Sequence, residues 1–512
     1  HTSSYSVTGV QTFALPILKK NLWVPLENDG GKVVIAVDNP QDIQKIDLIK
    51  PLYPNTHLDF RVALPGDIID FIKRFSLEEV RNVGDIDDIL HELQREADHD
   101  DDSDDEFDES DSAVVKLVNK IIQDAFARKA SDIHIEPYPG KQNTLVRIRI
   151  DGACTVYQTI PYNYKRAVVS RIKIMAGLDI AERRMPQDGK IQFKKYGGLD
   201  IELRVATIPT QGGLEDIVMR ILNAGEPIPL ANMGFSEQNF NRFVNLITQP
   251  YGIIYVCGPT GSGKTTTLHS ALAYINKTET KIWTAEDPVE ITQKGLRQVQ
   301  VHPKIGFTFA TAMRAFLRAD PDVIMVGEMR DKETTAIGIE ASLTGHLVLS
   351  TLHTNSAPES ITRLLDMGMD PFNFADAILG ILAQRLVRTL CKNCKRKYHA
   401  TAEEHAHLIE RYGKYEFEED FPDLLTYRDD LELREAVGCA ACGQTGYAGR
   451  MGIHELLVAT EDSKRMIQMQ ARLEELKDQA IKDGMRTLEQ DGIQKIFGGF
   501  TDIKQVRKVC VA

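Results

Sequence analysis

A glycine-rich segment that follows an apolar run carries the clearest chemical signal in the chain. The run Gly252–Cys257 is typical of a buried strand, and the segment after it reads Gly258-Pro-Thr-Gly-Ser-Gly-Lys264-Thr265. In this G-x-x-x-x-G-K-[ST] spacing, backbone N–H groups close round phosphates at a helix N-terminus. We expect Lys264 to reach the β- and γ-phosphates and the Thr265 hydroxyl to bind Mg²⁺, so the implied ligands are ATP and Mg²⁺. The alternative is an accidental glycine-rich turn. The strand before the segment and the helix expected from Thr266 argue against that alternative. The residues expected to bind nucleotide are Gly258, Pro259, Thr260, Gly261, Ser262, Gly263, Lys264, Thr265 and Thr266.

Hydrolysis also requires a carboxylate that orients and activates water. Two acidic segments follow the glycine-rich loop, residues 286–290 and residues 320–331, and the second places Glu328 just beyond an apolar strand. That is where a Mg²⁺-organising carboxylate belongs, although either segment taken singly could be a solvated turn. A further apolar strand lies between His346 and His353. The residues alone leave two roles open for these histidines, a structural one and a polar sensor of the γ-phosphate.

Four of the seven cysteines fall into two Cys-x-x-Cys pairs, Cys391/Cys394 and Cys439/Cys442. Four thiolates can close a tetrahedral structural Zn²⁺ site. The 44 residues between the pairs exceed the spacing of a compact zinc ribbon, which is about 15–20 residues. Reduced core cysteines and redox chemistry are the alternatives. The small number of cysteines argues against a disulfide scaffold and favours the cytoplasm.

Length and charge limit the organisation that can position these residues. At about 150 residues per domain, 512 residues indicate three or four domains. The net charge is −13, but ten acidic residues lie among the fourteen from Asp98 to Asp111, so the remainder carries −13 + 10 = −3. This nearly neutral remainder lacks the basic surface of a nucleic-acid binder. The acidic run is typical of a solvated linker, with an anion-mimicking tail as the alternative. No stretch approaches the roughly 18–20 apolar residues that span a bilayer.

The start of the chain has the pattern of a small α/β segment. Lys32 to Val37 is a short apolar run typical of a strand, and Asn39 to Asp42 is a helix-start signal. Ile68 to Phe75 has apolar residues at the spacing of a helix.

Changes of pattern along the chain divide it into segments. Strict alternation over Thr144 to Asp151, a hairpin turn at Asp151-Gly152 and a second alternating strand, Ile201 to Thr207, predict an α+β domain. Apolar strands alternating with helices after a hinge at Gly225 to Pro229 predict a parallel sheet with both faces covered. The expected segments are a non-native or disordered start (1–17), a truncated N-terminal domain (18–78), an acidic linker (79–112), an α+β domain (113–224), an α/β core (225–390), a cysteine insert (391–450) and a helical C-terminal region (451–512).

The order of the motifs resembles the ATPase family that drives type II secretion pseudopili and type IV pili. The segments that carry the resemblance are 131–137, 183–189, the glycine-rich loop, 286–290, 320–331, 344–354 and 484–492. The resemblance implies an α/β fold with a RecA-like P-loop core, a PAS-like α+β domain before it, a tetracysteine zinc insert and a helical tail. It also implies a homohexamer in which each two-domain subunit clamps ATP.

Site residues can be carried over by position from this resemblance. Glu290 matches the family's catalytic glutamate, Glu328 its Walker B glutamate, and His346 and His353 its histidine box. Arg204 and Arg220 match arginines that close onto the γ-phosphate, with a solvated strand face as the alternative. The chain departs from the family at residues 211–216, which lack the basic residue often found there. Assembly and secretion members carry a tetracysteine insert, which supports Zn²⁺ at Cys391, Cys394, Cys439 and Cys442.

The implied function is a cytoplasmic motor, peripheral at the inner membrane, in which ATP hydrolysis drives pseudopilus or pilus assembly. Its expected partners are an inner-membrane platform protein and a cytoplasmic docking protein, with no nucleic acid. The docking domain of some members binds cyclic di-GMP. The alternatives are a nucleic-acid translocase of the conjugation type and a nucleotide-gated binding module without turnover. The sequence does not separate secretion from pilus extension.

Overall fold

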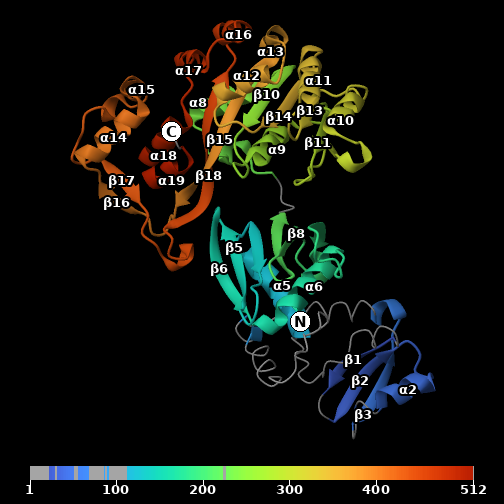
Figure 1. Cartoon of the computed structure of the whole chain (residues 1–512). Helices are drawn as coiled ribbons and strands as arrows, with labels where there is room; N and C mark the ends of the chain where they lie inside the picture. Colours follow the sequence, from blue (N-terminus) through green and yellow to red (C-terminus); the bar gives the residue numbers. More distant parts are fainter. Residues whose placement is uncertain are drawn as a thin grey trace. The chain divides into compact units, whose positions relative to one another are not determined.

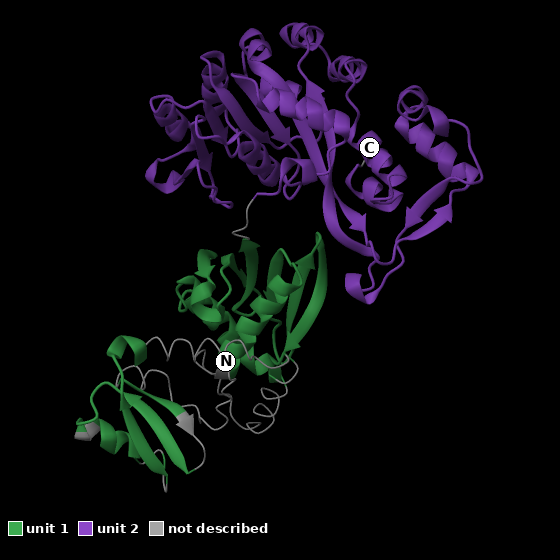
Figure 2. Ribbon diagram, turned by 180° about the vertical axis from the view of Figure 1, so that it is seen from behind, with its two compact units in different colours: residues 1–222 green, residues 223–512 purple. Residues whose placement is uncertain are grey.

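The structure is a computed structural model that describes residues 22–28, 31–50, 53, 56–68, 86, 89–90, 112–222 and 227–510. The chain divides into two compact units, residues 1–222 and 223–512 (Figure 2). The expectations for residues 1–17, for most of the acidic segment and for the first residues of the hinge lie outside the described residues. Among the described helices, none is both long and apolar enough to cross a membrane.

The first described part of the chain is a small three-stranded sheet with one helix. Its elements are β1 (Trp23–Asn28), β2 (Lys32–Val37), α2 (Ile43–Ile49) and β3 (His57–Val62). The strand order is β1-β2-β3, and β2 has the bounds expected from the sequence. Asp42 caps α2 by accepting a hydrogen bond from the backbone N–H of Lys45, as the helix-start signal indicates. The helix expected from Ile68 onward lies mostly outside the described residues.

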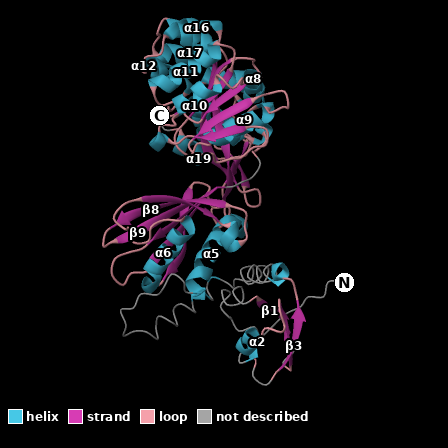
Figure 3. Cartoon of the chain, turned by 90° about the vertical axis from the view of Figure 1, so that its right-hand side faces the viewer, coloured by secondary structure: helices cyan, strands magenta, loops and turns pink. Residues whose placement is uncertain are grey.

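Residues 112–222 form the expected α+β domain. Its main elements are α5 (Ser112–Ala127), β4 (Asp132–Glu136), β5 (Thr144–Ile150), β6 (Ala153–Ile160), α6 (Lys165–Ala176), β7 (Gln187–Gln192), α7 (Lys194–Gly197), β8 (Glu202–Thr210) and β9 (Leu214–Leu222). The sheet has the order β6-β5-β4-β9-β8-β7, and α5 and α6 pack beside it (Figure 3). Asp151 and Gly152 both have positive φ, 48° and 80°, which is the geometry of a two-residue hairpin turn.

The second unit is built on a seven-stranded sheet. The strands are β10 (Gly252–Cys257), β11 (Ile282–Glu286), β12 (Arg297–Gln300), β13 (Val323–Val326), β14 (Leu347–Leu352), β15 (Ile378–Leu390) and β18 (Tyr447–Val458). Their order is β12-β11-β13-β14-β10-β15-β18, and every pairing is parallel except that of β15 with β18 (Figure 1). This sheet confirms the expected α/β core and adds an antiparallel edge.

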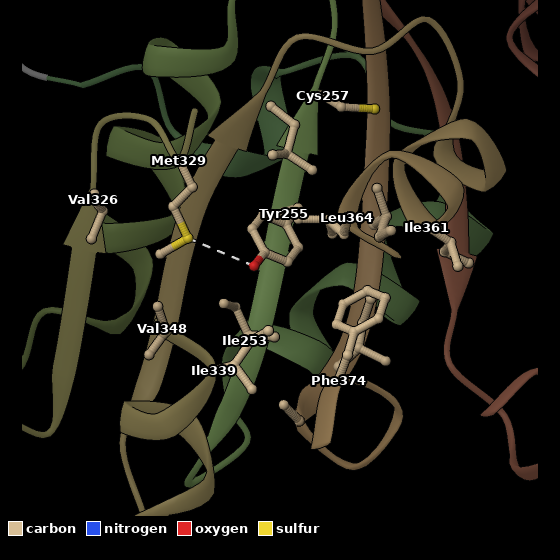
Figure 4. Packing of buried hydrophobic residues seen from close by; sticks show 14 of the residues in the cluster. Ile253, Tyr255, Cys257, Val326, Met329, Ile339, Val348, Ile361, Leu364 and Phe374 are labelled. Atoms are coloured by element: carbon tan, nitrogen blue, oxygen red, sulfur yellow. Dashed lines mark hydrogen bonds between the residues drawn. The ribbon is translucent and has the colours of Figure 1, made fainter. Parts of the chain in front are cut away.

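Helices cover both faces of this sheet. They are α8 (Glu237–Ile247), α9 (Lys264–Ile275), α10 (Phe309–Phe316), α11 (Lys332–Leu343), α12 (Ala357–Asp366) and α13 (Pro371–Ala377). Every residue of β10 is buried, and alternate side chains enter different cores. Ile253 and Tyr255 pack with α10–α13, whereas Ile254 and Val256 pack with α8 and α9. On the first face the Tyr255 hydroxyl lies 3.6 Å from Sδ of Met329 (Figure 4). A strand buried on both faces holds the loop that follows it firmly.

The cysteine insert lies between the two antiparallel strands β15 and β18. It contains β16 (Arg396–His399), α14 (Ala402–Tyr412), α15 (Lys414–Asp420) and β17 (Glu432–Glu435). The insert shares a core with two of the C-terminal helices, which are α16 (Glu461–Gln468), α17 (Leu473–Lys482), α18 (Leu488–Phe497) and α19 (Ile503–Val509). Strand β18 crosses residue 450, where the sequence places the start of the helical region, and the helices begin only at Glu461. Pairing with β15 buries Ile453, Leu456 and Leu457, and this long-range contact outweighs the local pattern.

Candidate nucleotide site and cysteine cluster

The glycine-rich loop connects the carboxyl end of β10 to the first turn of α9, which begins at Lys264. A Cβ at Gly258 would lie 2.6 Å from the carbonyl oxygen of Gln384, and Gly263 has φ of 88°. Both positions therefore require glycine. The Lys264 ammonium donates to the carbonyl oxygens of Gly258 at 2.8 Å and Pro259 at 3.1 Å. Burial lowers the pKa of Lys264. The loop thus holds a cation beside a row of backbone N–H groups, which is an arrangement that binds phosphate.

A cluster formed by Glu328 and His353 lies at the same end of the sheet. Glu328 follows β13 and His353 follows β14, and Nε2 of His353 is 3.6 Å from Oε2 of Glu328. Nε of Arg330 donates to the same carboxylate oxygen at 2.6 Å. Burial, together with the nearby charge of Lys264, lowers the pKa of His353, so the imidazole is neutral at pH 7. Neutral imidazole can act as a hydrogen-bonding sensor for phosphate or water.

A cavity of about 430 Å³ joins this cluster to the glycine-rich loop. It is lined by Thr260, Met329, Arg330, Leu352, His353, Thr354, Arg363 and Met367. The structure therefore brings together the expected loop and His353 in a space that can admit a phosphoryl group.

The two glutamates of the 286–290 segment have different surroundings. Glu286, 3% exposed, ends β11 and accepts hydrogen bonds from Thr284 at 2.6 Å, Gln298 at 3.0 Å and His269 at 3.1 Å. Burial raises the pKa of Glu286, but the three hydrogen bonds together lower it by more, so the net shift of the pKa is downward. Because its oxygens are occupied, Glu286 is suited to holding the strand rather than to activating water. Glu290 is half-buried in the loop after β11, at the carboxyl end of the parallel sheet.

His346 does not lie near the loop. It precedes β14, and the parallel pairing of Leu347 with Gly252 places it at the amino end of the sheet. Its Nδ1 lies 2.9 Å from the carbonyl oxygen of Ala341 near the end of α11. The two histidines sit at opposite ends of one strand, so within a single chain only His353 can face the loop.

Arg204 and Arg220 belong to the first unit. They are direct cross-strand partners on β8 and β9, so their side chains share one face of that sheet. Nε of Arg220 donates to Oδ1 of Asp132 at 2.9 Å, and the Arg220 side chain is 54% exposed. Arg204 is half-buried. The structure thus brings the two arginines together on one sheet face.

The four paired cysteines converge. Their sulfur atoms all lie within 4.8 Å of one another, with Sγ–Sγ distances of 4.0 Å for Cys391–Cys439 and 3.8 Å for both Cys394–Cys442 and Cys439–Cys442. A tetrahedral Zn²⁺ with Zn–S bonds of about 2.3 Å requires Sγ–Sγ distances of about 3.8 Å. The cluster could therefore hold zinc, and the insertion of 44 residues between the pairs does not prevent this.

Gln384 and Arg385 of β15 were not expected from the sequence. Gln384 contacts the glycine-rich loop, and Arg385 donates to the backbone oxygen of Asn355 at 3.0 Å, close after His353. The local signal is weak, because Gln384-Arg385 is one of two polar pairs in the largely apolar run 378–390, the other being Arg388-Thr389. The role of Gln384 and Arg385 becomes visible only when β15 is known to lie beside β10.

Known proteins resemble this chain over almost its whole length. The chain matches the family described as Type II/IV secretion system protein over residues 108–508, and the MshEN domain over residues 6–82. It is 42% identical over 497 residues to the type IV pilus assembly ATPase PilB of Myxococcus xanthus, covering 96% of this chain and 84% of that protein. It is 41% identical over 502 residues to the type II secretion system protein E of Xanthomonas campestris, covering 98% of this chain and 85% of that one.

A solved structure supports the fold. The pilus retraction motor PilT with bound ADP matches with a TM-score of 0.53 and 24% identity, covering 77% of this chain and 97% of that one. The family expected from the motifs is confirmed: the chain belongs to the type II/IV secretion system protein family.

Proposed function

We propose that this chain is a motor ATPase that hydrolyses ATP to drive the assembly of a type IV pilus or a type II secretion pseudopilus. The observation that carries the proposal is the meeting of the glycine-rich loop, Glu328 and His353 at one end of a parallel sheet. Relatives named for pilus assembly and for type II secretion match almost the whole chain, at 42% and 41% identity. These relatives favour a filament motor over a nucleic-acid translocase.

Each residue of the site has a distinct role in this proposal. Lys264 and the loop N–H groups bind the phosphates, and the Thr265 hydroxyl binds Mg²⁺. Glu328 organises the metal and its water, and His353 senses the γ-phosphate. Glu290 accepts the proton of the attacking water. His346 is left with a structural role at the far end of β14.

Two further groups complete the proposed machine. Arg204 and Arg220 neutralise charge on the transferring phosphoryl group when the two units close on ATP. Cys391, Cys394, Cys439 and Cys442 hold a structural Zn²⁺. The subunits form a homohexamer in the cytoplasm, peripheral at the inner membrane, that acts on a platform protein and is held by a docking protein.

The test measures ATP turnover by phosphate release. Lys264→Ala and Glu290→Gln should each lower kcat by about 10²–10⁴ while the melting temperature stays near that of the unaltered protein. Glu474→Gln, an exposed change on α17, is the matched control and should leave turnover unchanged. Near-normal turnover by Glu290→Gln would contradict the role of this residue, and absence of turnover in the unaltered protein would contradict the proposed function.

A further inference from the structure

The glycine-rich loop has a neighbour whose side chain no catalytic role requires. Strand β15 pairs with β10 up to Ala383 opposite Cys257, and it continues where β10 ends. Gln384 is therefore the first residue of β15 at the level of the loop, and its side chain is fully buried. A buried amide must satisfy its own hydrogen bonds, because an unpaired buried polar group is costly.

Both polar atoms of the Gln384 amide form hydrogen bonds, one with the glycine-rich loop and one with α9. Nε2 donates to the carbonyl oxygen of Ser262 at 2.9 Å, and Oε1 accepts from the Thr267 hydroxyl at 2.6 Å. The side chain thus joins the backbone of the loop to the first turn of α9.

The bond to Ser262 fixes more than one oxygen atom. A trans peptide is planar, with its C=O and N–H pointing in opposite directions. Holding the Ser262 carbonyl toward β15 therefore aims the N–H of Gly263 away from β15, toward the inside of the loop. Glycine at 263 does not fix the orientation of this peptide plane by itself, because the glycine backbone adopts many conformations. A Cβ at Gly263 would lie 2.8 Å from Nε2 of Gln384, so the glycine and the glutamine fit each other closely.

We propose that Gln384 is a positioning residue for nucleotide binding: it sets the peptide plane between Ser262 and Gly263 so that the Gly263 N–H can bind phosphate. The inference rests on the proposed function only in taking the glycine-rich loop as the ATP site. Gln384 does not touch ATP, and it acts through the loop.

The test separates positioning from stability by comparing two buried glutamines. Gln384→Leu removes both hydrogen bonds and leaves the Ser262 carbonyl unpaired. Gln490→Leu is the matched control, since Gln490 is 5% exposed and donates to the carbonyl of Tyr412 at 2.6 Å in another part of the unit. Steady-state ATP hydrolysis and the melting temperature are measured for both variants.

Gln384→Leu should raise the KM for ATP about tenfold or more, while kcat changes less than threefold. The reason is that a misdirected Gly263 N–H weakens the binding of the substrate and of the transition state equally. Both variants should lower the melting temperature by similar amounts, because each loses the hydrogen bonds of a buried glutamine. Gln490→Leu should leave the KM for ATP unchanged. An unchanged KM in Gln384→Leu, or an equal rise in both variants, would overturn the inference. Loss of turnover in the unaltered protein would instead contradict the proposed function.

Thr267→Val keeps the inference testable if Gln384→Leu does not fold. It replaces the hydroxyl by a methyl group of similar size and leaves Oε1 of Gln384 without its donor. It should raise the KM for ATP about threefold, the effect of one neutral hydrogen bond. In a soluble Gln384→Leu protein the added Thr267→Val should raise KM no further, because both changes act through the same side chain. Additive effects, or an unchanged KM in Thr267→Val, would overturn the inference.

Discussion

Replacing Cys442 by Ser should remove zinc and destabilise the second unit. Burial raises the pKa of Cys442, but the backbone N–H groups of Cys439 and Gly446, which both donate to its sulfur at 3.2 Å, lower it to about 6. Cys442 is therefore a thiolate at neutral pH, the form that binds Zn²⁺. Ser keeps the shape but offers a neutral hydroxyl, which is a poor zinc ligand.

The size of the effect follows from the four-sulfur site. Structural zinc contributes roughly 10–16 kcal/mol to folding, and an equal share for each of the four ligands is about 2.5–4 kcal/mol. This share is the smallest loss of stability expected when Cys442→Ser weakens zinc binding. At about 2–4 °C per kcal/mol for a large domain, the melting temperature should fall by about 5 °C or more.

The assay combines metal analysis with thermal unfolding of protein purified under reducing conditions. The unaltered protein should hold one zinc per chain, and Cys442→Ser should hold much less. Cys154→Ser, in β6 of the first unit, is the control and should change neither zinc content nor the melting temperature of the second unit. A full complement of zinc in Cys442→Ser, or no zinc in the unaltered protein, would refute the reasoning.

Two further predictions concern the arginine pair and a buried histidine. Arg204→Ala and Arg220→Ala should each lower kcat about 10³-fold or more but change ADP affinity less than threefold, since ADP lacks the γ-phosphate. Unchanged turnover would show that both arginines belong to a solvated strand face. Burial lowers the pKa of His454 well below its ordinary value, so below pH 6.5 the unfolded chain binds a proton that the folded chain does not. Through this residue, the free energy of unfolding should fall by roughly 2 kcal/mol when the pH is lowered from 7 to 5. Urea unfolding at the two pH values measures this loss, and His454→Phe should show a loss smaller by that amount. The same pH dependence in His454→Phe and in the unaltered protein would contradict the prediction.

Features set by neighbouring residues were predictable from the sequence. The run Gly252–Cys257 gives β10 with its expected bounds, because six apolar residues before a glycine-rich turn have few other structures. The Asp151-Gly152 turn and the Asp42 cap depend on residues two or three positions apart. The meeting of Glu328 with His353 was also predictable in outline, since carboxyl ends of parallel strands share one edge of a sheet.

Features set by distant pairing were not predictable. The sequence shows that His346 and His353 flank a strand, but the direction of that strand relative to β10 decides which of them faces the loop. Gln384 has meaning only through its neighbour β10, more than a hundred residues earlier in the chain. The sequence predicts a helical region from residue 451, but residues 451–458 belong to β18, whose partner β15 lies far away in sequence.

Strand β15 also connects the two chemical centres, and its length suggests how far they are coupled. Gln384 contacts the nucleotide loop, and Cys391 follows the other end of the same strand. Seven residues at about 3.3 Å each separate them by roughly 23 Å. Between them β15 is paired with β18 at Arg385, Leu386, Val387, Arg388 and Leu390. Loss of zinc frees the Cys391 end first, and these pairs must open before the Ser262 carbonyl loses its partner. We therefore expect Cys442→Ser to lose stability well before it loses ATP affinity. A tenfold rise in the KM for ATP at a temperature where Cys442→Ser remains folded would show that the two centres are coupled more tightly than the strand alone allows.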